Sequence, residues 1–400
     1  VEDYSTEYNG YNVTNTHTPE QTSVTVSKQW ADSNDQDGIR PEHIVVVLLA
    51  NGEPTEQTLT LNAGNGWTGS FTGLDKYEDG VEIVYSVAEV SVEGYTTTVT
   101  GDQLSGYHIT NTHTPETTSV SGSKTWNDND DQDGFRPESI TVNLLADGEV
   151  IQTITVTEAD EWSWSFENLP KYRDHGTLIV YSVTEEAIDE YSTEYNGFNI
   201  TNTHTPEQTS VTVSKVWDDS NNQDGIRANN VTVVLLANGE DTGKSLVLNA
   251  GNGWTGSFTE LDKYQDGEVI TYTVQELQIA GYASVITGNQ TEGYRITNSH
   301  TPETVTVSGS KTWDDNNNQD GFRPEAITIN LLADGEVIDT VTVTEESGWA
   351  WSFENLPKYR DQGTLIIYSV TEDAVEDYST EYNGYNVTNT HAPEKTSVSV

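Results

Sequence analysis

A lysine, a glutamate and an asparagine recur four times along this 400-residue chain, at matching positions of a repeated unit. The triads are Lys28/Glu89/Asn111, Lys124/Glu185/Asn202, Lys215/Glu276/Asn298 and Lys311/Glu372/Asn389. A neutral lysine amine is a nucleophile, and a protonated carboxyl group can polarise an amide carbonyl and carry protons. Together the three groups can join the lysine to the asparagine side chain with loss of ammonia, which makes a covalent Lys–Asn isopeptide bond.

Strand alternation places the triads inside the fold. Lys28 shares a strand face with Val26, Asn111 shares one with Ile109, and Glu89 closes an alternating apolar segment. Burial lowers the pKa of a lysine and favours the neutral forms that the reaction needs, while folding holds the reactants in contact. Each unit would react once, with Glu89, Glu185, Glu276 and Glu372 as the assisting acids, so we expect self-processing and no turnover enzyme.

The alternative for each triad is a buried Lys–Glu ion pair with the asparagine as a hydrogen-bonding neighbour. Four copies favour the reaction, because an ion pair does not require the asparagine. Four further lysines occupy a [DP]-K-Y turn, and we expect these to be solvated. They are Lys76, Lys171, Lys263 and Lys358.

The repeated unit exists in two lengths. The lysine-to-glutamate spacing is 61 residues in every unit, whereas the glutamate-to-asparagine spacing alternates between 22 and 17. The difference predicts a fixed core with one variable hairpin. Asn196-Gly197 and Asn383-Gly384 predict tight two-residue hairpins in the short units, and 101–106 and 288–293 predict wider loops in the long ones.

The spacing divides the chain into four complete repeats and two fragments. The predicted repeats are 21–115, 116–206, 207–302 and 303–393. Residues 1–20 nearly duplicate 375–394 and are expected to be the tail of a preceding truncated repeat, which leaves Asn15 without a lysine of its own unit. Residues 394–400 are expected to start a further truncated repeat.

The segments that carry the triads read as β-strands. Ile44–Leu49 and Ile140–Leu145 are rich in branched aliphatic residues, and Ile83–Glu89 and Ile179–Glu185 alternate. No segment has a helical period. Units of fewer than 100 residues with short strands predict an all-β fold of tandem small sandwiches, and short linkers stiffened by proline predict a rod.

Composition excludes several classes of function. A net charge of −48 argues against nucleic acid and anionic membranes as partners, and the absence of cysteine excludes disulfides and thiolate metal sites. No stretch reaches the length of a membrane-spanning helix, and the N-terminus is no signal peptide, so any targeting or anchoring segments are expected outside this chain. The sequence contains no nucleophile–His–acid arrangement and no Gly-rich phosphate loop, so neither a turnover enzyme nor a cofactor is expected.

Other polar and aromatic residues have simpler interpretations. Asn129, Asp131 and Asp133 resemble the opening of a calcium loop, but Ile140 stands where its glutamate belongs, so an Asx-rich turn is preferred. Five of the eight histidines follow a closing asparagine by two residues, which favours a role at the linker edge. Two aromatic groups share strand faces, Trp67 with Phe71 and Trp162 with Trp164 and Phe166, and they are expected in the core in preference to a sugar-binding platform.

The combined motifs resemble a known family. The pattern V-S-K-x-W-x-D, Q-D-G-x-R-P, L-L-A-[ND]-G, Y-[ST]-V-x-E and I-T-N-T-H-T-P-E is similar to the Cna B-type repeat of Gram-positive surface proteins. Arg227-Ala228 departs from the Arg-Pro of the other units, away from the triad. The resemblance implies an inverse immunoglobulin-like sandwich, a glutamate-assisted Lys–Asn isopeptide bond, and a cell-wall-anchored, extracellular setting.

Two functions follow from this resemblance. The first is an adhesin stalk that projects a ligand-binding head, with neighbouring repeats as its partners and a host matrix or glycan ligand bound by other domains. The second is a binding module in which the repeats themselves engage host matrix protein or glycan. Near-duplicate units favour the stalk, because a stalk needs only length, and the wide hairpins are the one candidate binding surface.

Overall fold

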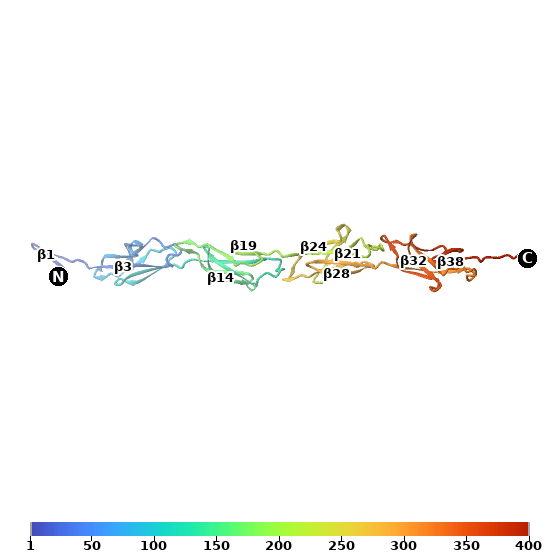
Figure 1. The fold of residues 1–400 in the computed structure, drawn as a ribbon. Coiled ribbons are helices and arrows are strands. Elements are labelled where there is room, and N and C mark those ends of the chain that lie inside the picture. Colours follow the sequence, from blue (N-terminus) through green and yellow to red (C-terminus); the bar gives the residue numbers. More distant parts are fainter. Residues whose placement is uncertain (1, 399–400) are drawn as a thin grey trace. The chain divides into compact units, whose positions relative to one another are not determined.

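The computed structural model describes residues 2–398, which form four equivalent sets of β-strands, here named repeats 1 to 4 (Figure 1). A hairpin of β1 (Ser5–Asn9) and β2 (Asn12–Thr16) precedes them. Repeat 1 comprises β3 (Gln21–Ala31), β4 (His43–Ala50), β5 (Glu53–Asn62), β6 (Thr68–Asp75), β7 (Tyr77–Glu78), β8 (Val81–Glu82), β9 (Tyr85–Glu89), β10 (Thr96–Asp102) and β11 (Gly106–Thr112). Repeat 2 comprises β12 (Thr117–Asn127), β13 (Ser139–Ala146), β14 (Glu149–Thr157), β15 (Ser163–Pro170), β16 (Tyr172–Arg173), β17 (Thr177–Leu178), β18 (Tyr181–Glu185), β19 (Ser192–Asn196) and β20 (Asn199–Thr203).

The second half of the chain repeats this order. Repeat 3 comprises β21 (Gln208–Asp218), β22 (Asn230–Ala237), β23 (Glu240–Asn249), β24 (Thr255–Asp262), β25 (Tyr264–Gln265), β26 (Glu268–Val269), β27 (Tyr272–Glu276), β28 (Ala283–Asn289) and β29 (Gly293–Ser299). Repeat 4 comprises β30 (Thr304–Asp314), β31 (Ala326–Ala333), β32 (Glu336–Thr344), β33 (Ala350–Pro357), β34 (Tyr359–Arg360), β35 (Thr364–Leu365), β36 (Tyr368–Glu372), β37 (Ser379–Asn383) and β38 (Asn386–Thr390). The helices of residues 2–398 are the short 3-10 turns η1 (Ala63–Asn65), η2 (Glu158–Asp160) and η3 (Ala250–Asn252).

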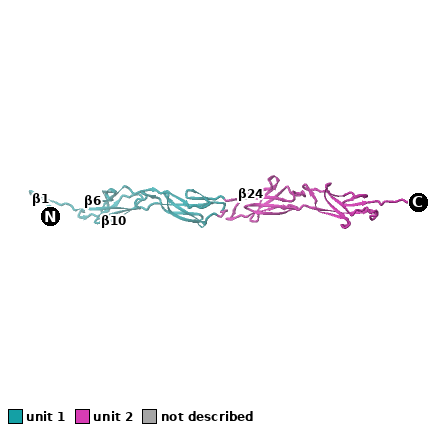
Figure 2. Ribbon diagram, viewed as in Figure 1, with its two compact units in different colours: residues 1–130, 135–205 teal, residues 131–134, 206–400 magenta. Residues whose placement is uncertain are grey.

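The chain divides into two compact units (Figure 2). One holds residues 1–130 and 135–205, which are repeat 1 and most of repeat 2, and the other holds residues 131–134 and 206–400, with repeats 3 and 4. Within the described part of the chain, no helix has the length and apolar character needed to cross a bilayer.

Each repeat is a two-sheet sandwich, as predicted. In repeat 1 a four-stranded sheet has the order β10-β11-β3-β6, and a three-stranded sheet has the order β5-β4-β9. The first strand, β3, pairs antiparallel with β6 and parallel with the last strand, β11. Apolar side chains from both sheets fill the space between them, with Val24, Val46, Leu48, Leu61 and Ile109 fully buried. The alternation of apolar residues therefore produces the expected core.

The hairpin that differs between long and short repeats lies where the sequence predicted it. In repeat 2, Asn196 pairs with Asn199, so the two-residue loop is Gly197-Phe198, one residue later than expected. Gly197 has a φ of +63°, a left-handed conformation that glycine adopts without strain. In repeat 1 the longer β10 and β11 pair up to Asp102 and Gly106, which leaves the wider loop predicted there.

The glutamate strand is shorter than predicted. It begins at Tyr85 and not at Ile83, because the backbone N–H groups of residues 83 and 84 donate hydrogen bonds to groups outside the sheet. The Ile83 N–H donates to the Lys76 carbonyl at 2.9 Å, and the Val84 N–H donates to Asn51 Oδ1 at 3.0 Å. The second repeat shows the same shift, since β18 begins at Tyr181.

Candidate crosslinking site

The fold brings each predicted triad together. Lys28 lies on β3 and Asn111 on the neighbouring parallel strand β11, where Lys28 pairs with Ile109 and Trp30 pairs with Asn111. Paired residues of adjacent strands point to the same face, so the lysine and the asparagine both face the interior. Glu89 comes from the end of β9 in the opposite sheet and meets them across the core. The other three repeats have the same arrangement.

All four lysines form an ion pair with their glutamate. The Nζ–Oε1 distance is 3.1 Å for Lys28–Glu89, 2.6 Å for Lys124–Glu185 and 3.8 Å for Lys215–Glu276, and Lys311 pairs closely with Glu372. The side chains of these pairs are almost completely removed from solvent, with at most 2 % of any of them exposed. The asparagines are also buried.

Burial changes the proton affinity of these lysines. It lowers the pKa of Lys28 from its ordinary value, although the Glu89 carboxylate acts in the opposite direction. The same cause lowers the pKa of Lys124 and Lys311, and it brings the pKa of Lys215 to about 8. The neutral, nucleophilic amine is therefore easier to reach here than in a solvated lysine.

The asparagine amide is bonded differently in the long and the short repeats. In repeats 1 and 3 its Nδ2 donates to glutamate Oε1, at 3.2 Å for Asn111 and 3.1 Å for Asn298. In repeats 2 and 4, both amide atoms of Asn202 and Asn389 are buried and have no hydrogen-bond partner within residues 2–398. A buried amide without partners is unfavourable. An ion pair with a satisfied asparagine neighbour therefore does not describe the short repeats.

A tryptophan also belongs to each site, and the sequence analysis assigned it no role there. The lysine Nζ lies 4.1–4.4 Å from the ring centre of the tryptophan two residues later. These rings are Trp30, Trp126, Trp217 and Trp313. The K-x-W spacing puts both side chains on one strand face and could have indicated the contact. Trp30 in turn packs edge-on against Trp67 and Tyr95. The predicted core position of the aromatic residues is confirmed, since Phe71, Trp164 and Phe166 are buried and Trp67 and Trp162 pack against the same cores.

The acidic loop after the first strand is organised by an internal ion pair. Asp32 is buried and accepts hydrogen bonds from Arg40 Nε at 2.9 Å, Arg40 Nη2 at 2.6 Å and Tyr95 Oη at 2.9 Å. Burial acts against ionisation, but these donors and the Asp35 N–H lower the pKa of Asp32 to about 2. Arg227 with Asp219 and Arg323 with Asp315 repeat the arrangement.

The calcium alternative concerns the same loop in repeat 2. Asn129 and Asp131 lie in its turn with φ of +55° and +59°, and Asp133 is buried. Among the residues described, no group of three or more histidine, cysteine, aspartate or glutamate side chains is arranged to hold a metal ion. The Asx-rich turn stays the preferred interpretation, with calcium binding at Asn129, Asp131 and Asp133 as its untested alternative.

A buried aspartate fixes the linker that leaves repeat 1. Asp37 Oδ2 lies 2.8 Å from His113 Nε2 and accepts the Glu116 N–H at 2.7 Å. The hydrogen bond to Asp37 raises the pKa of His113. The predicted position of this histidine at the linker edge is therefore confirmed. Asp224 holds His300 and Glu303 in the same way.

The turn lysines are partly exposed at the surface, as expected, and each also pairs with a carboxylate of the preceding linker. Lys171 Nζ pairs with the linker carboxylate of Glu116 at 2.6 Å, and its N–H donates to the Glu116 carbonyl at 3.0 Å. Lys76 with Glu20, Lys263 with Glu207 and Lys358 with Glu303 form equivalent pairs at 2.6–2.8 Å. The partners are more than 50 residues apart, which hid the pairing from local sequence patterns.

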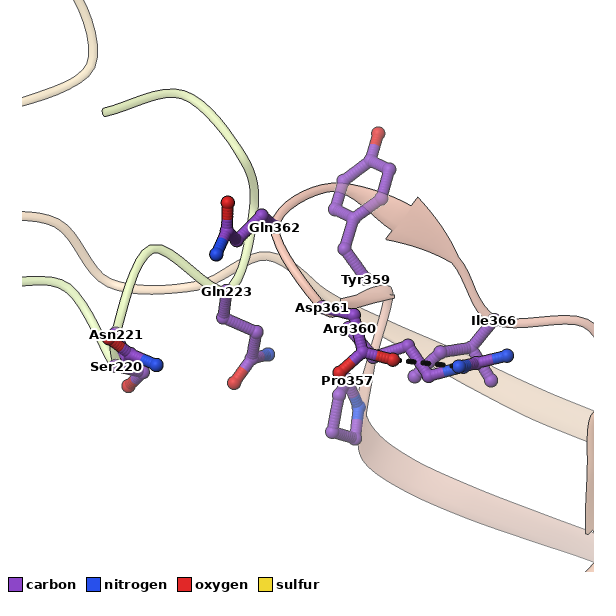
Figure 3. A pocket seen from close by; sticks show the side chains of 9 residues that line it. All are labelled: Ser220, Asn221, Gln223, Pro357, Tyr359, Arg360, Asp361, Gln362 and Ile366. Atoms are coloured by element: carbon purple, nitrogen blue, oxygen red, sulfur yellow. Dashed lines mark hydrogen bonds and ion pairs between the residues drawn. The ribbon is translucent and has the colours of Figure 1, made fainter. Parts of the chain in front are cut away.

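A cavity of about 430 Å³ lies where the loop of repeat 3 meets a turn of repeat 4 (Figure 3). Its one guanidinium, Arg360, is already bound by Asp334 at 2.9 Å and by Asp361 at 2.8 Å. The backbones meet at the cavity wall, where the Gly363 N–H donates to the Gln223 carbonyl at 3.0 Å. The cavity is therefore the edge of a contact between neighbouring repeats.

Comparison with known proteins identifies the family to which the repeats belong. The family model described as Cna protein B-type domain matches residues 24–112, 120–203, 211–299 and 307–390. The collagen adhesin of Staphylococcus aureus is 48% identical over 402 residues, covering 100% of this chain and 34% of the adhesin. The chain thus spans about a third of that relative.

Two solved structures from the same organism are also similar. A crystal structure of two B repeat units of the Staphylococcus aureus collagen binding protein is 37% identical and covers 93% of this chain and 100% of its own, with a TM-score of 0.42. A structure of a single B repeat unit is 47% identical and covers 47% of this chain and 100% of its own, with a TM-score of 0.24. On the family match and the identity to the adhesin, the chain belongs to the Cna protein B-type domain family, of which it carries four tandem copies.

Proposed function

We propose that this chain is a structural stalk region of a bacterial cell-surface adhesin, in which each repeat is stabilised by an autocatalytic Lys–Asn isopeptide bond. The observation that carries the proposal is the placement of the triad. A buried lysine on the first strand and a buried asparagine on the adjacent last strand face a glutamate from the opposite sheet, four times in one chain.

The glutamate is placed to move the protons of the reaction. Glu89 Oε1 lies 3.1 Å from Lys28 Nζ and accepts a hydrogen bond from Asn111 Nδ2 at 3.2 Å. It can take a proton from the amine and deliver one to the departing nitrogen. As Nζ bonds to Asn111 Cγ, the Cγ–Nδ2 bond breaks and ammonia leaves. One amine and one primary amide thus become one secondary amide, and the carboxyl group is unchanged.

The crosslink fits a stalk. It closes a loop of 83 residues in the long repeats and 78 in the short ones. By analogy with disulfides, closing such a loop reduces the entropy of the unfolded chain, which stabilises the folded repeat by about 4–5 kcal/mol. A bond between the first and last strands also carries tension past the rest of the sandwich, and reductants do not release it.

The setting of the stalk follows from the homology. A homologue of a cell-surface adhesin is expected outside the cell and attached to the wall through segments beyond this chain. We propose repeat boundaries at 21–115, 116–206, 207–302 and 303–393, with neighbouring repeats as the direct partners.

The decisive experiment is the intact mass of the purified chain beside a Glu89→Ala variant. The wild-type chain should be lighter than its sequence by four ammonia molecules, and the variant by three. Glu93→Ala is the matched control, because Glu93 is exposed in the same repeat, and it should keep the deficit of four. An unshifted wild-type mass would reduce the triads to buried polar clusters and end the crosslinking proposal.

The alternative binding-module function has one supporting observation. Leu104, at the tip of the wide hairpin of repeat 1, is fully exposed. The corresponding residue of repeat 3 is Thr291, so this apolar tip is not shared between the long repeats. Binding of the purified chain to host matrix proteins or glycans, lost in a Leu104→Ser variant, would favour the binding module.

A further inference from the structure

A hydroxyl side chain stands beside the asparagine of every triad. It lies on the other strand of the closing hairpin, directly opposite the asparagine in the antiparallel register. The pairs are Thr97–Asn111, Thr193–Asn202, Ser284–Asn298 and Thr380–Asn389. Three are threonines and one is a serine, so the serine repeat can be compared with the threonine repeats within one chain.

In repeat 1 this hydroxyl connects the acid to the amide carbonyl. Thr97 Oγ1 lies 2.7 Å from Glu89 Oε2 and 2.8 Å from Asn111 Oδ1. Glu89 itself contacts the amide nitrogen through its other oxygen, Oε1. The carbonyl oxygen, which gains negative charge when the amine attacks, is therefore linked to the carboxyl group through Thr97. A hydroxyl accepts one hydrogen bond while donating another, so it can pass a proton between them.

In repeat 3 the same link is missing. The contact between Asn298 Nδ2 and Glu276 Oε1 is kept at 3.1 Å, but Ser284 stands where repeat 1 has Thr97. Glu276 Oε2 and Asn298 Oδ1 are both buried and have no hydrogen-bond partner among the described residues. These two atoms are the counterparts of those that Thr97 bridges. The difference therefore follows the change from threonine to serine.

The short repeats are intermediate. Thr193 Oγ1 lies 3.4 Å from Glu185 Oε2, and Thr380 Oγ1 lies 3.3 Å from Glu372 Oε2. The threonine thus reaches the acid in both short repeats. The Oδ1 atoms of Asn202 and Asn389 have no hydrogen-bond partner in the described part of the chain.

We propose that the threonine hydroxyl relays a proton between the glutamate and the asparagine carbonyl oxygen, and that repeat 3, which has Ser284, forms its crosslink most slowly. This inference rests on the crosslinking function proposed above. Glu89, protonated by the lysine amine, donates from Oε2 to Thr97 Oγ1, and Thr97 donates its own proton to Asn111 Oδ1 as the Nζ–Cγ bond forms. Glu89 Oε1 then takes a proton from Nζ and gives one to Nδ2, the Cγ–Nδ2 bond breaks and ammonia leaves. The relay runs backwards to restore the carbonyl, and the proton that returns to Glu89 leaves with the ammonia as ammonium, so the hydroxyl and the carboxylate are unchanged.

The test follows each repeat separately in the full 400-residue chain. The chain is made by cell-free translation, portions are stopped in acidic denaturant at intervals, and the crosslinked peptides of each repeat are measured by mass after digestion. Thr97→Val keeps the shape of the side chain and removes the hydroxyl. It should slow crosslinking in repeat 1 roughly a hundredfold, at the low end of acid–base effects, while repeats 2 to 4 serve as internal controls.

Two further variants distinguish the relay from simple packing. Thr97→Ser should slow repeat 1 to the rate of repeat 3, and Ser284→Thr should raise the rate of repeat 3 to that of repeat 1. The gain in repeat 3 decides the question even if Thr97→Val folds poorly. Equal rates in wild-type repeats 1 and 3, with Ser284→Thr unchanged, would overturn the relay. Absence of ammonia loss from every wild-type repeat would instead overturn the crosslinking function itself.

Discussion

Lys28 and Asn111 lie on adjacent parallel strands at the centre of one sheet, with Asn111 two residues beyond the partner of Lys28. These strands are the first and the last of the repeat. Tension on the chain would enter at the start of β3 and leave at the end of β11, so it would shear this pair of strands. A bond between the two side chains would oppose that motion directly.

Glu185→Gln should leave repeat 2 uncrosslinked and less stable. In the variant the Lys124 amine would stay unreacted and buried without an anionic partner, which costs about 3–5 kcal/mol, and the loop-closing bond would be absent, which costs about 4–5 kcal/mol. Peptide mapping should show free Lys124 and Asn202, and calorimetry should show a new transition at lower temperature. Glu186→Gln changes an exposed neighbour and should do neither. A crosslinked repeat 2 in the Glu185→Gln chain would contradict the assigned role.

Asp32→Asn should destabilise repeat 1 by about 3 kcal/mol, because Arg40 would lose the carboxylate that it binds through two nitrogens. The pKa of Asp32 is lowered to about 2, so its contribution is complete above the ordinary aspartate pKa and is lost as the pH falls through about 2. Thermal unfolding between pH 2 and 5 should therefore be steeper in pH for the wild type than for the variant. The exposed residue Asp79, changed to asparagine, is the control. Parallel pH profiles for wild type and Asp32→Asn would contradict the assignment.

His113 gives a second pH dependence, of opposite sign. Its pKa is raised by Asp37, so the stabilisation from this pair is complete below the ordinary histidine pKa and is lost as the pH rises through the raised value. His113→Gln should therefore reduce the melting temperature more at pH 5 than at pH 9. His43→Gln alters an exposed histidine on the same repeat and should show no such difference. An equal loss at both pH values would mean that protonated His113 does not stabilise the linker.

Two substitutions of Glu116 distinguish the backbone hydrogen bond of the linker from its side-chain ion pair. The Glu116 carboxylate pairs with Lys171 at the surface, so Glu116→Gln should cost at most about 1 kcal/mol. Glu116→Pro also removes the N–H that Asp37 accepts, and it should cost about 1–3 kcal/mol more, since the Asp37 carboxylate is buried. Urea unfolding of the two variants measures the difference. Equal stabilities would show that the buried hydrogen bond is unimportant.

Much of the site could be predicted from the sequence because strand alternation is a local property. Lys28, Glu89 and Asn111 each fall at an apolar position of their own segment, and the repeat shows that they belong together. The position of Thr97 beside Asn111 could not be predicted from strand alternation. It is the middle of three consecutive threonines, 96–98, and only the register of β10 against β11 shows which of them faces Asn111.

Contacts between distant segments were likewise hidden. The pairing of Lys171 with Glu116 links a turn to a linker 55 residues earlier, and no periodicity reports such a contact. The late start of the glutamate strand, at Tyr85 and not at Ile83, has a similar origin, since the side chain of Asn51 in another loop accepts the Val84 N–H.

Glu116 is shared by two repeats, because its N–H is bound by Asp37 of repeat 1 and its carboxylate by Lys171 of repeat 2. The free energies of unfolding of these two repeats are therefore not independent quantities. In a linear array, such nearest-neighbour terms make the loss of one member lower the stability of the next. A single repeat excised from the chain should consequently unfold more readily than the same repeat beside its neighbour, and the pair should melt with greater cooperativity than the sum of its parts.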